Sequence, residues 1–212
     1  MDKTPNTINV FNKHAVGYQQ KFMDQSMYQD SFAEFCNHLP PNNPTILDVA
    51  CGPGNITKCL LALRPDLQIT GIDLAPNMLA LAAENNPTAT FRLMDCRYIA
   101  NLPGPYSGVM CGFCLPYLTR EEAVQFIADA ATILTPGGVL YLSTMEDNHT
   151  ASGWQKSSTG DDMYINYHEA IYLIEALSRN NFTLLREQRI TYSTAPGKLV
   201  IDLILIASLN GR

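Results

Sequence analysis

Positive charge and long apolar runs are both scarce in this chain of 212 residues. Its 14 Lys and Arg stand against 20 Asp and Glu, and the formal net charge of -6 provides no basic face for nucleic acid. The apolar run VIDLILIASL contains Asp202 and is too short for a membrane span, so it favours a buried strand. A basic start followed by an apolar signal region is also missing from MDKTPNTINVFNKHA, and we therefore expect a cytoplasmic protein without a membrane partner.

Cysteine is present, but the spacing of a metal or redox site is almost absent. The chain has six cysteines, and Cys111 and Cys114 are separated by two residues. No second such pair follows, and a free thiol in an apolar run behaves as a small hydrophobic group. Glu146 and His149 in EDNH also lack a recognisable ligand spacing. We expect no metal.

The middle of the chain alternates between strand and helix patterns. A hydrophobic fraction of 46% supports a sizeable core. Predicted strands cover 45–50, 68–73, 90–95, 107–113 and 138–144, and predicted helices cover 56–65, 75–86 and 119–136. Such alternation indicates an α/β fold with a parallel sheet and helices on both faces. Two further apolar runs, 182–190 and 198–209, predict a terminal hairpin that places one antiparallel strand in the sheet.

Two segments fall outside this alternation. Residues 1–38 predict one or two amphipathic helices, and residues 146–168 are polar with scattered aromatics. We divide the chain into an N-terminal helical cover segment (1–38) and a main domain (39–212), in which 146–168 is a loop or lid insertion. Both segments are expected to close over a ligand as a mobile cover.

The stretch ILDVACGPGN marks the expected ligand site. A strand ends at Asp48 and runs into a turn with Gly52 and Gly54, where glycine permits positive φ and close approach of a ligand. The next strand ends in Asp73, 21 positions after Gly52, and an acid at that distance typically accepts from both ribose hydroxyls. Strand ends meet at one edge of a parallel sheet, so the sequence predicts a nucleoside site there.

Two kinds of nucleoside cofactor are considered for this site. A nicotinamide dinucleotide needs a third glycine where the chain has Thr57, and the carboxylate of Asp48 would repel a pyrophosphate. The pattern favours a nucleoside without phosphates that carries a positive group. A dinucleotide-dependent oxidoreductase remains the alternative, although Tyr164 has His168 where such reductases have Lys.

Four motifs together resemble the class I S-adenosylmethionine-dependent methyltransferases of small-molecule type: ILDVACGPGNIT, ITGIDLAPNML, FRLMDC and ILTPGGVLYLS. The resemblance covers about residues 8 to 208. It implies a Rossmann-like, seven-stranded, mostly parallel sheet with an antiparallel C-terminal hairpin. It also implies S-adenosylmethionine as cofactor, S-adenosylhomocysteine as product, and methyl transfer to a small organic acceptor by direct in-line displacement. Ala50 departs from the usual first glycine, and Ala75 from a capping serine.

The resemblance carries over a set of residues expected to bind the cofactor. These are Tyr18, Asp48, Ala50, Gly52, Gly54, Asp73, Leu74, Met78, Asp95, Cys96, Cys111 and Phe113. Several also have a purely structural interpretation: Asp48 and Asp95 as caps, Asp73 as a solvated strand end, and Tyr18 as a core aromatic. Cys96 would contribute only its backbone amide.

Contacts to the acceptor are expected from the variable segments. The candidates are Tyr117, Glu146, Trp154, Tyr164, Tyr167 and His168, with His149 as a candidate general base. His149 is also interpretable as an exposed loop histidine, and Trp154 as a loop anchor. We expect a monomer or homodimer, and a protein that binds S-adenosylmethionine without catalysis is a further alternative.

Overall fold

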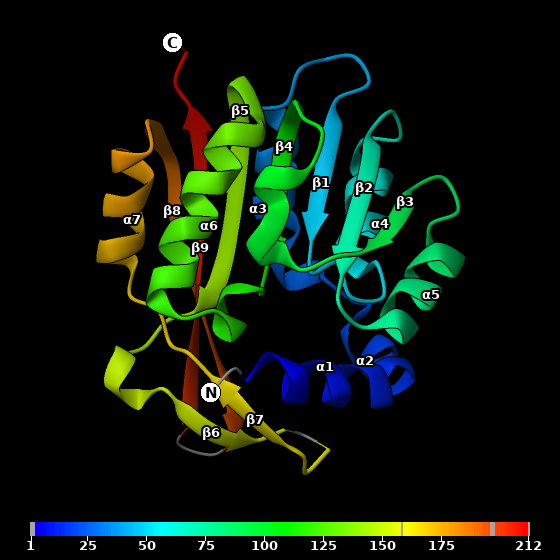
Figure 1. The fold of residues 1–212 in the computed structure, drawn as a ribbon, viewed down its shortest axis with the longest axis vertical. Helices are drawn as coiled ribbons and strands as arrows, with labels where there is room; N and C mark the ends of the chain where they lie inside the picture. Colours follow the sequence, from blue (N-terminus) through cyan, green and yellow to red (C-terminus); the bar gives the residue numbers. More distant parts are fainter. Residues whose placement is uncertain (1–2, 158, 196–197, 212) are drawn as a thin grey trace.

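The computed structural model describes residues 3–157, 159–195 and 198–211. Residues 1–2 and 158, which fall in the two expected cover segments, lie outside the described residues. A seven-stranded sheet runs in the order β3-β2-β1-β4-β5-β9-β8 (Figure 1). Its strands are β1 (Thr45–Val49), β2 (Gln68–Asp73), β3 (Thr90–Leu93), β4 (Tyr106–Gly112), β5 (Leu134–Met145), β8 (Phe182–Ala195) and β9 (Lys198–Leu209). A separate two-stranded sheet is formed by β6 (Gly153–Lys156) and β7 (Asp162–Ile165).

Helices precede, connect and cover these strands. The α-helices are α1 (Thr4–Lys13), α2 (Ala15–Phe22), α3 (Gln29–Asn37), α4 (Asn55–Leu63), α5 (Pro76–Asn85), α6 (Arg120–Ile133) and α7 (Ala170–Arg179). Short 3-10 helices are η1 (Ser26–Tyr28), η2 (Cys96–Asn101), η3 (Leu115–Tyr117) and η4 (His149–Ala151). The predicted capping box of α6 is present: Thr119 Oγ1 accepts from the Glu122 amide, and the Glu122 carboxylate accepts from the Thr119 amide.

Strand direction confirms the predicted fold class. β1 pairs in parallel with both β2 and β4, and β4 pairs in parallel with β5. β9 is antiparallel to both of its neighbours, β5 and β8. The strand order reverses between β1 and β4, which is where open α/β sheets bind ligands.

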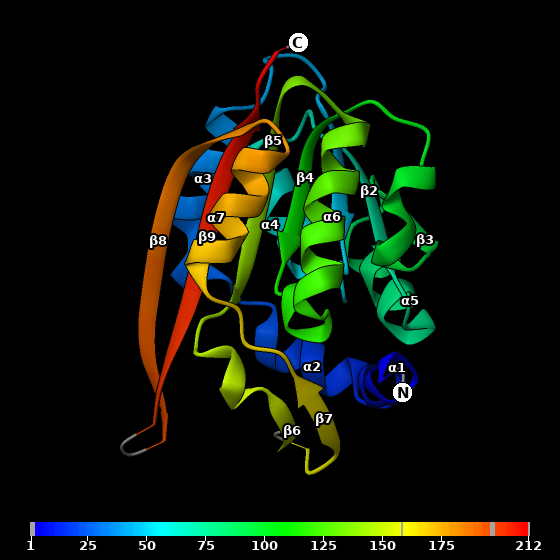
Figure 2. The same cartoon turned by 60° about the vertical axis from the view of Figure 1, so that its left-hand side comes forward.

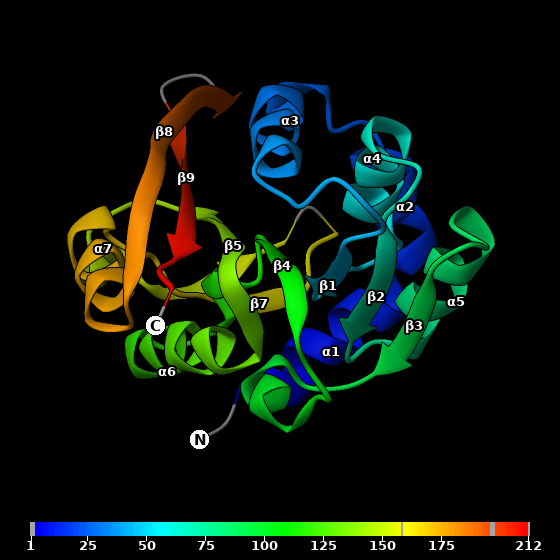
Figure 3. The same cartoon turned by 90° about the horizontal axis from the view of Figure 1, so that it is seen from above.

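Two apolar layers bury the sheet. Residues of α6 and α7 pack on one face with Leu140 and Leu205, while α3 and α4 pack on the other with Tyr141 and Ile204. Figures 2 and 3 show the two helix layers on opposite sides of the sheet. The β4 strand at its centre is buried along almost its whole length.

Three local predictions need correction. The helix expected over 119–136 ends at Ile133, because Leu134 already pairs with Tyr106 as the first residue of β5. The segment 146–168, expected to be a loop or lid insertion without regular structure, contains the antiparallel hairpin β6–β7. Residues 1–38 form three α-helices, and α3 belongs to the core because Phe32 and Phe35 are fully buried on the sheet.

The remaining N-terminal helices lie below the carboxyl ends of the central strands. In Figure 1, α1 and α2 cross beneath β1 and β2, beside the β6–β7 hairpin. Among the described helices, none is long and apolar enough to cross a membrane.

Candidate active site

The turn after β1 is built from left-handed backbone. Ala50, Gly52 and Gly54 have φ angles of 52°, 53° and 76°. Gly54 has no alternative, because a Cβ there would lie 2.3 Å from Asn86 Nδ2 and 3.2 Å from the Ala82 backbone. A glycine at this position therefore lets α4 approach α5 closely.

Backbone amides of this turn are used inside the protein. The Cys51 amide donates to the Ile72 carbonyl at 3.0 Å, and the Gly54 amide donates to the Cys51 carbonyl at 3.0 Å. The Gly52 amide donates to Asp73 Oδ2 at 2.9 Å. The amides of Cys51, Gly52 and Gly54 are therefore not free to bind a phosphate.

Asp73 holds the next strand end to this turn. Its Oδ1 accepts from the Ala75 amide at 2.8 Å, while its Oδ2 accepts from Gly52. The two bonds fix the carboxylate at the wall of a hollow and leave each oxygen a further lone pair. Burial raises the pKa of Asp73, and the backbone hydrogen bonds oppose that rise.

The hollow lies between the strand ends and α1. It is an open, largely apolar concavity with a few polar side chains, the kind of site in which small molecules and cofactors bind. Nine predicted cofactor residues line it: Tyr18, Ala50, Gly52, Asp73, Leu74, Met78, Asp95, Cys96 and Phe113. The structure therefore brings most of the predicted set to one place.

Three predicted cofactor residues do not line this hollow. Asp48 is 1% exposed, and its Oδ2 accepts from Thr57 Oγ1 at 2.5 Å. Its Oδ1 has no hydrogen-bond partner, and burial raises its pKa to about 7. Gly54 and Cys111 are also absent from the lining. Asp48 faces α4 behind the turn, so direct contact with a ligand does not fit its position.

One end of the hollow is lined by Asp95 and Cys96. Asp95 caps η2 by accepting from the Arg97 amide at 2.9 Å, and it also pairs with the Arg97 guanidinium at 2.6 Å. Asp95 therefore acts as a cap, which was its alternative role in the sequence analysis, and it also lines the hollow. Cys96 Sγ lies 3.5 Å from Cys114 Sγ, a proximity that their spacing in sequence gave no reason to expect.

The other end is aromatic. Phe113 has φ +56°, an outlier for a bulky residue, and Ser143 holds it by accepting from the Phe113 amide through its carbonyl at 3.2 Å and its Oγ at 3.0 Å. Tyr18 lies over the glycine turn, with its Cε1 3.9 Å from where a Cβ of Gly52 would be. Burial and nearby Asp73 raise the pKa of Tyr18 to about 12.

The N-terminal helix closes one side of the hollow with residues that the sequence analysis did not name individually. Thr4, Thr7, Ile8 and Phe11 of α1 are among the lining residues. The Phe11 ring meets those of Tyr18 and Tyr117 edge-on, at centroid distances of 5.6 and 5.3 Å. The amphipathic pattern of α1 was the available signal, but it did not say which surface its apolar face covers.

Two of the acceptor candidates border open space. Tyr117 lines the hollow, and Tyr117 and Tyr164 line a second, adjoining hollow with Lys3, Arg97 and Asn166. Trp154 is 56% exposed and contacts the Tyr164 ring edge-on at 5.7 Å, outside both hollows.

Two other acceptor candidates have structural partners instead. His168 is fully buried, with Nδ1 bonded to the Tyr172 hydroxyl and Nε2 donating to the Leu115 carbonyl at 2.7 Å. Glu146 accepts from the Arg189 guanidinium and from the Ala170 amide. His168 and Glu146 therefore do not fit the role of acceptor contacts.

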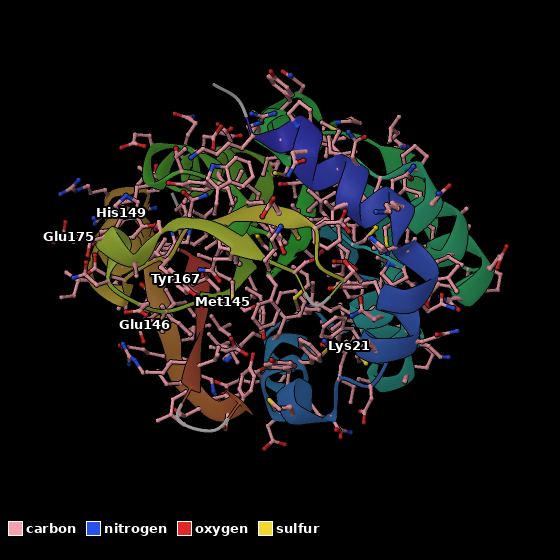
Figure 4. The ribbon with its side chains drawn as sticks, turned by 90° about the horizontal axis from the view of Figure 1, so that it is seen from below. Lys21, Met145, Glu146, His149, Tyr167 and Glu175 are labelled. Atoms are coloured by element: carbon pink, nitrogen blue, oxygen red, sulfur yellow. The ribbon has the colours of Figure 1, made fainter. Side chains whose placement is uncertain are left out.

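Tyr167 and His149 lie on the side of the molecule that Figure 4 shows from below, but they line neither hollow. Figure 4 shows Tyr167 next to Met145, with Glu146 and His149 further toward the edge. Tyr167 accepts from Gln155 Nε2 at 3.1 Å, and the His149 ring contacts the Tyr167 carbonyl at 3.4 Å. In the described part of the chain, no group of three or more His, Cys, Asp or Glu is arranged to hold a metal ion.

Comparison with known proteins now adds to this geometry. Residues 46–138 match the sequence model of the family described as "Methyltransferase domain". The chain is 31% identical over 120 residues to a ubiquinone biosynthesis O-methyltransferase of Xanthomonas campestris, a match over 54% of this chain and 48% of that protein. It is 31% identical over 124 residues to a trans-aconitate 2-methyltransferase of Methylobacterium radiotolerans, over 55% of this chain and 44% of that protein.

A solved structure matches over nearly the whole chain. It is the 1,6-didemethyltoxoflavin-N1-methyltransferase of Burkholderia thailandensis, with its substrate and S-adenosylhomocysteine bound. The TM-score is 0.71 at 19% identity, and the match covers 98% of this chain and 89% of that one. Residues 46–138 are thus similar in sequence to a methyltransferase domain, and nearly the whole chain shares the fold of this solved methyltransferase.

The match to the methyltransferase-domain model covers the middle of the chain. The matched segment runs from β1 to the start of β5 and includes the glycine turn, Asp73 and Asp95. The matches span less than half the length of the two curated methyltransferases. The end segments that border the hollow lie outside the residues matched by the family model, although the structural match includes most of them.

Proposed function

We propose that this protein is a methyltransferase that binds S-adenosylmethionine in the hollow and transfers its methyl group to a small organic acceptor. The observation that carries the proposal is the Asp73 carboxylate, which two backbone amides fix at the wall of the hollow. A carboxylate held in this way is preorganised to accept from the two hydroxyls of a ribose. The bound cofactor supplies an electrophilic methyl group on a sulfonium, whose leaving thioether is neutral.

The chain's own groups fit the two ends of such a cofactor. Leu74, Met78 and Cys96 supply apolar walls for an adenine, beside Asp95. Tyr18 is protonated at neutral pH, as any phenol of pKa 10 or above is, and its hydroxyl can donate to the carboxylate of the amino-acid end. Phe113 and Tyr117 wall off the side toward the acceptor. Alignment of this kind is worth on the order of 7–11 kcal/mol in well-oriented reactions.

The same geometry disfavours the dinucleotide alternative. A pyrophosphate needs backbone N–H groups at the glycine turn, but Cys51, Gly52 and Gly54 already donate within the protein. Thr57, which replaces the third glycine, donates to the buried Asp48. These bonds support a cofactor that carries no phosphate in this turn.

The test is an assay of S-adenosylhomocysteine release. The purified protein, S-adenosylmethionine and fractions of a small-metabolite extract should yield S-adenosylhomocysteine in at least one fraction, above the level without extract. Tight binding of S-adenosylhomocysteine with no release in any fraction would instead support a non-catalytic binder. Cytoplasmic location, absence of a nucleic-acid partner and a monomeric or homodimeric state remain part of the proposal.

A further inference from the structure

Two cysteine thiols meet in the wall of the hollow. Cys96 is the first residue of η2, after β3, and Cys114 lies between β4 and η3. Their Sγ atoms are 3.5 Å apart, and both residues line the hollow. Cys114 is 3% exposed and Cys96 is half-buried, so a small molecule that enters the hollow can reach the pair. The pair therefore lies at the proposed cofactor site.

This pair differs from the one that the spacing in the sequence suggests. Cys111 and Cys114 are separated by two residues, but Cys111 is buried in β4 and does not line the hollow. Cys96 comes from another segment, 18 positions before Cys114. The Cys114 thiol hydrogen-bonds with both of them, and all six cysteines of the chain are free thiols.

The short distance between the two sulfur atoms favours a bond between them. A disulfide has an S–S length of about 2.05 Å, so the Sγ atoms need to approach by roughly 1.5 Å. Cys96 and Cys114 belong to connecting segments, which move more readily than the paired strands of the sheet. Once one sulfur is oxidised, its neighbour is already held in place to react with it.

We propose that Cys96 and Cys114 are a site of reversible oxidation, at which a hydroperoxide produces a disulfide that excludes the cofactor. The sulfur of Cys96, the more exposed of the two, attacks the peroxide, the O–O bond breaks, and an alcohol or water leaves. Cys114 then attacks the resulting sulfenic acid, the S–S bond forms, and water leaves. The two thiols lose two electrons and two protons in all, and the peroxide takes them up. The exclusion of the cofactor rests on the proposed function.

The disulfide and the cofactor compete because they use the same wall. Cys96 follows Asp95, at the end of the hollow proposed for adenine, and Cys114 follows Phe113. A bond between the two sulfur atoms draws these segments together and narrows the hollow between them. Linkage requires the reverse effect to be equally large. If the disulfide weakens cofactor binding tenfold, the bound cofactor raises the reduction potential of the pair by about 30 mV.

Both thiols react slowly in the absence of a strong oxidant. The hydrogen bond with Cys114, together with burial, raises the pKa of Cys96. The hydrogen bond with Cys111, together with burial, raises the pKa of Cys114. Because the thiolate is the reactive form, oxidation at neutral pH needs a high concentration of peroxide. The pair is thus suited to respond to severe oxidation rather than to traces of peroxide.

The test treats the full chain with excess hydrogen peroxide, with and without saturating S-adenosylhomocysteine. Mass spectrometry of peptides, digested without reduction, identifies the linked cysteines. Calorimetry measures the affinity for S-adenosylhomocysteine before treatment, after treatment and after addition of dithiothreitol. The reductant separates a disulfide from oxidation of Met78 or Met94, which also line the hollow and whose sulfoxides dithiothreitol leaves in place.

The variants are Cys96→Ser and Cys114→Ser, and each is compared with itself before and after treatment. Cys111→Ala is the matched control, because Cys111 hydrogen-bonds with Cys114 but does not line the hollow. Wild type and control should form the Cys96–Cys114 link and bind S-adenosylhomocysteine at least tenfold more weakly, until dithiothreitol restores the affinity to within twofold. The two serine variants should show no loss that dithiothreitol reverses. Saturating ligand should slow formation of the link in the wild type.

Absence of the link, a link between Cys111 and Cys114 instead, or unchanged affinity in the linked protein would overturn the proposal. Should one serine variant not fold, the other decides, since either substitution removes the disulfide. Failure of the untreated wild type to bind S-adenosylhomocysteine would instead count against the proposed function. The oxidation site is then judged by mass spectrometry alone.

Discussion

At the scale of residues, the bond between Gly52 and Asp73 links the ends of two strands. The Gly52 amide donates to the Asp73 carboxylate, so the turn that follows β1 and the acid that ends β2 fix each other's position. A ligand that uses the second lone pairs of that carboxylate meets a group already oriented by the backbone. Asp73 is therefore the residue whose loss should weaken cofactor binding most directly.

Replacing Asp73 with Ala should weaken S-adenosylhomocysteine binding by roughly 1–3 kcal/mol, or about 5- to 150-fold in Kd. The physical reason is the loss of a charged acceptor for the ribose hydroxyls. Titration calorimetry measures the change, and Asp30→Ala, at an exposed position of α3, is the control. Equal affinities in wild type and Asp73→Ala would show that another group holds the ribose.

Ala50 offers a second residue-level test, of backbone strain. Its φ of +52° lies in the left-handed region, which is unfavourable by roughly 1–2 kcal/mol for a residue with a Cβ. Ala50→Gly should raise the free energy of unfolding by about 0.5–1 kcal/mol, after the greater chain entropy of glycine is subtracted. Chemical denaturation measures both variants, and the control Ala131→Gly, within helix α6, should lower the free energy of unfolding. Destabilisation by Ala50→Gly would contradict the argument.

The sequence predicted that Asp73 lies at the ligand site, but it did not predict that the Asp48 side chain points away from it. The difference has a physical reason. Asp73 follows from strand ends and spacing, which are local properties. The direction of the Asp48 side chain depends on Thr57, which α4 brings within 2.5 Å. The Tyr28–Asp202 bond joins residues 174 positions apart, and no pattern of local periodicity encodes it.

At the scale of elements, His168 joins the segment before α7 to η3. Its two ring nitrogens bond to the Tyr172 hydroxyl and the Leu115 carbonyl, and burial lowers its pKa to about 4. The unfolded chain then binds a proton near pH 6.5 that the folded protein does not bind until about pH 4. The stabilising effect of this neutral histidine is complete above pH 6.5 and is lost as the pH falls toward 4.

Between pH 7 and pH 5, His168 should therefore lower the free energy of unfolding by roughly 2 kcal/mol. Urea denaturation of wild type and His168→Gln at both pH values checks this, because the variant should lack that part of the pH dependence. His38→Gln, at an exposed position, is the control. An unchanged pH dependence in His168→Gln would contradict the proposed titration.

The contact between α1 and the β6–β7 hairpin is the other element-level feature. Asp161 bonds to Lys13 Nζ at 3.0 Å and to the His14 ring at 2.6 Å, and the Asn6 side chain donates to the Asp162 carbonyl at 2.6 Å. Val10 packs with Met163 and Ile165 beneath these bonds. We propose that α1, α2 and the hairpin form the mobile cover, and α3 is left out because it belongs to the core.

Bound S-adenosylhomocysteine should slow amide hydrogen exchange in α1 and β7, with little effect in α7. Asp161→Ala should reduce this protection and weaken ligand binding a few-fold, because it removes the bonds to Lys13 and His14. Asp162→Ala is the matched control, since its side chain pairs within the hairpin, with Lys156. Exchange in α1 and β7 that is identical with and without ligand would mean that these elements are permanently ordered.

At the scale of the whole molecule, the sheet could be predicted and the cover could not. Strand–helix alternation from 45 to 144 reports local burial, and each predicted strand there is present. The β6–β7 hairpin was missed because its segment is polar, and it is held by contacts with α1, about 150 residues away in the chain. The N-terminal helices had a visible amphipathic pattern, but the sequence does not say that α3 covers the sheet while α1 covers the hollow.

The central claim is that the hollow is built for S-adenosylmethionine rather than for a dinucleotide. Titration calorimetry of the wild-type protein with S-adenosylhomocysteine, NADH and NADPH tests it most directly. We expect saturable binding of S-adenosylhomocysteine, because the Asp73 carboxylate is oriented toward a ribose, and no measurable binding of either dinucleotide, because the amides of the glycine turn are already bonded. Tighter binding of NADH or NADPH than of S-adenosylhomocysteine would contradict it.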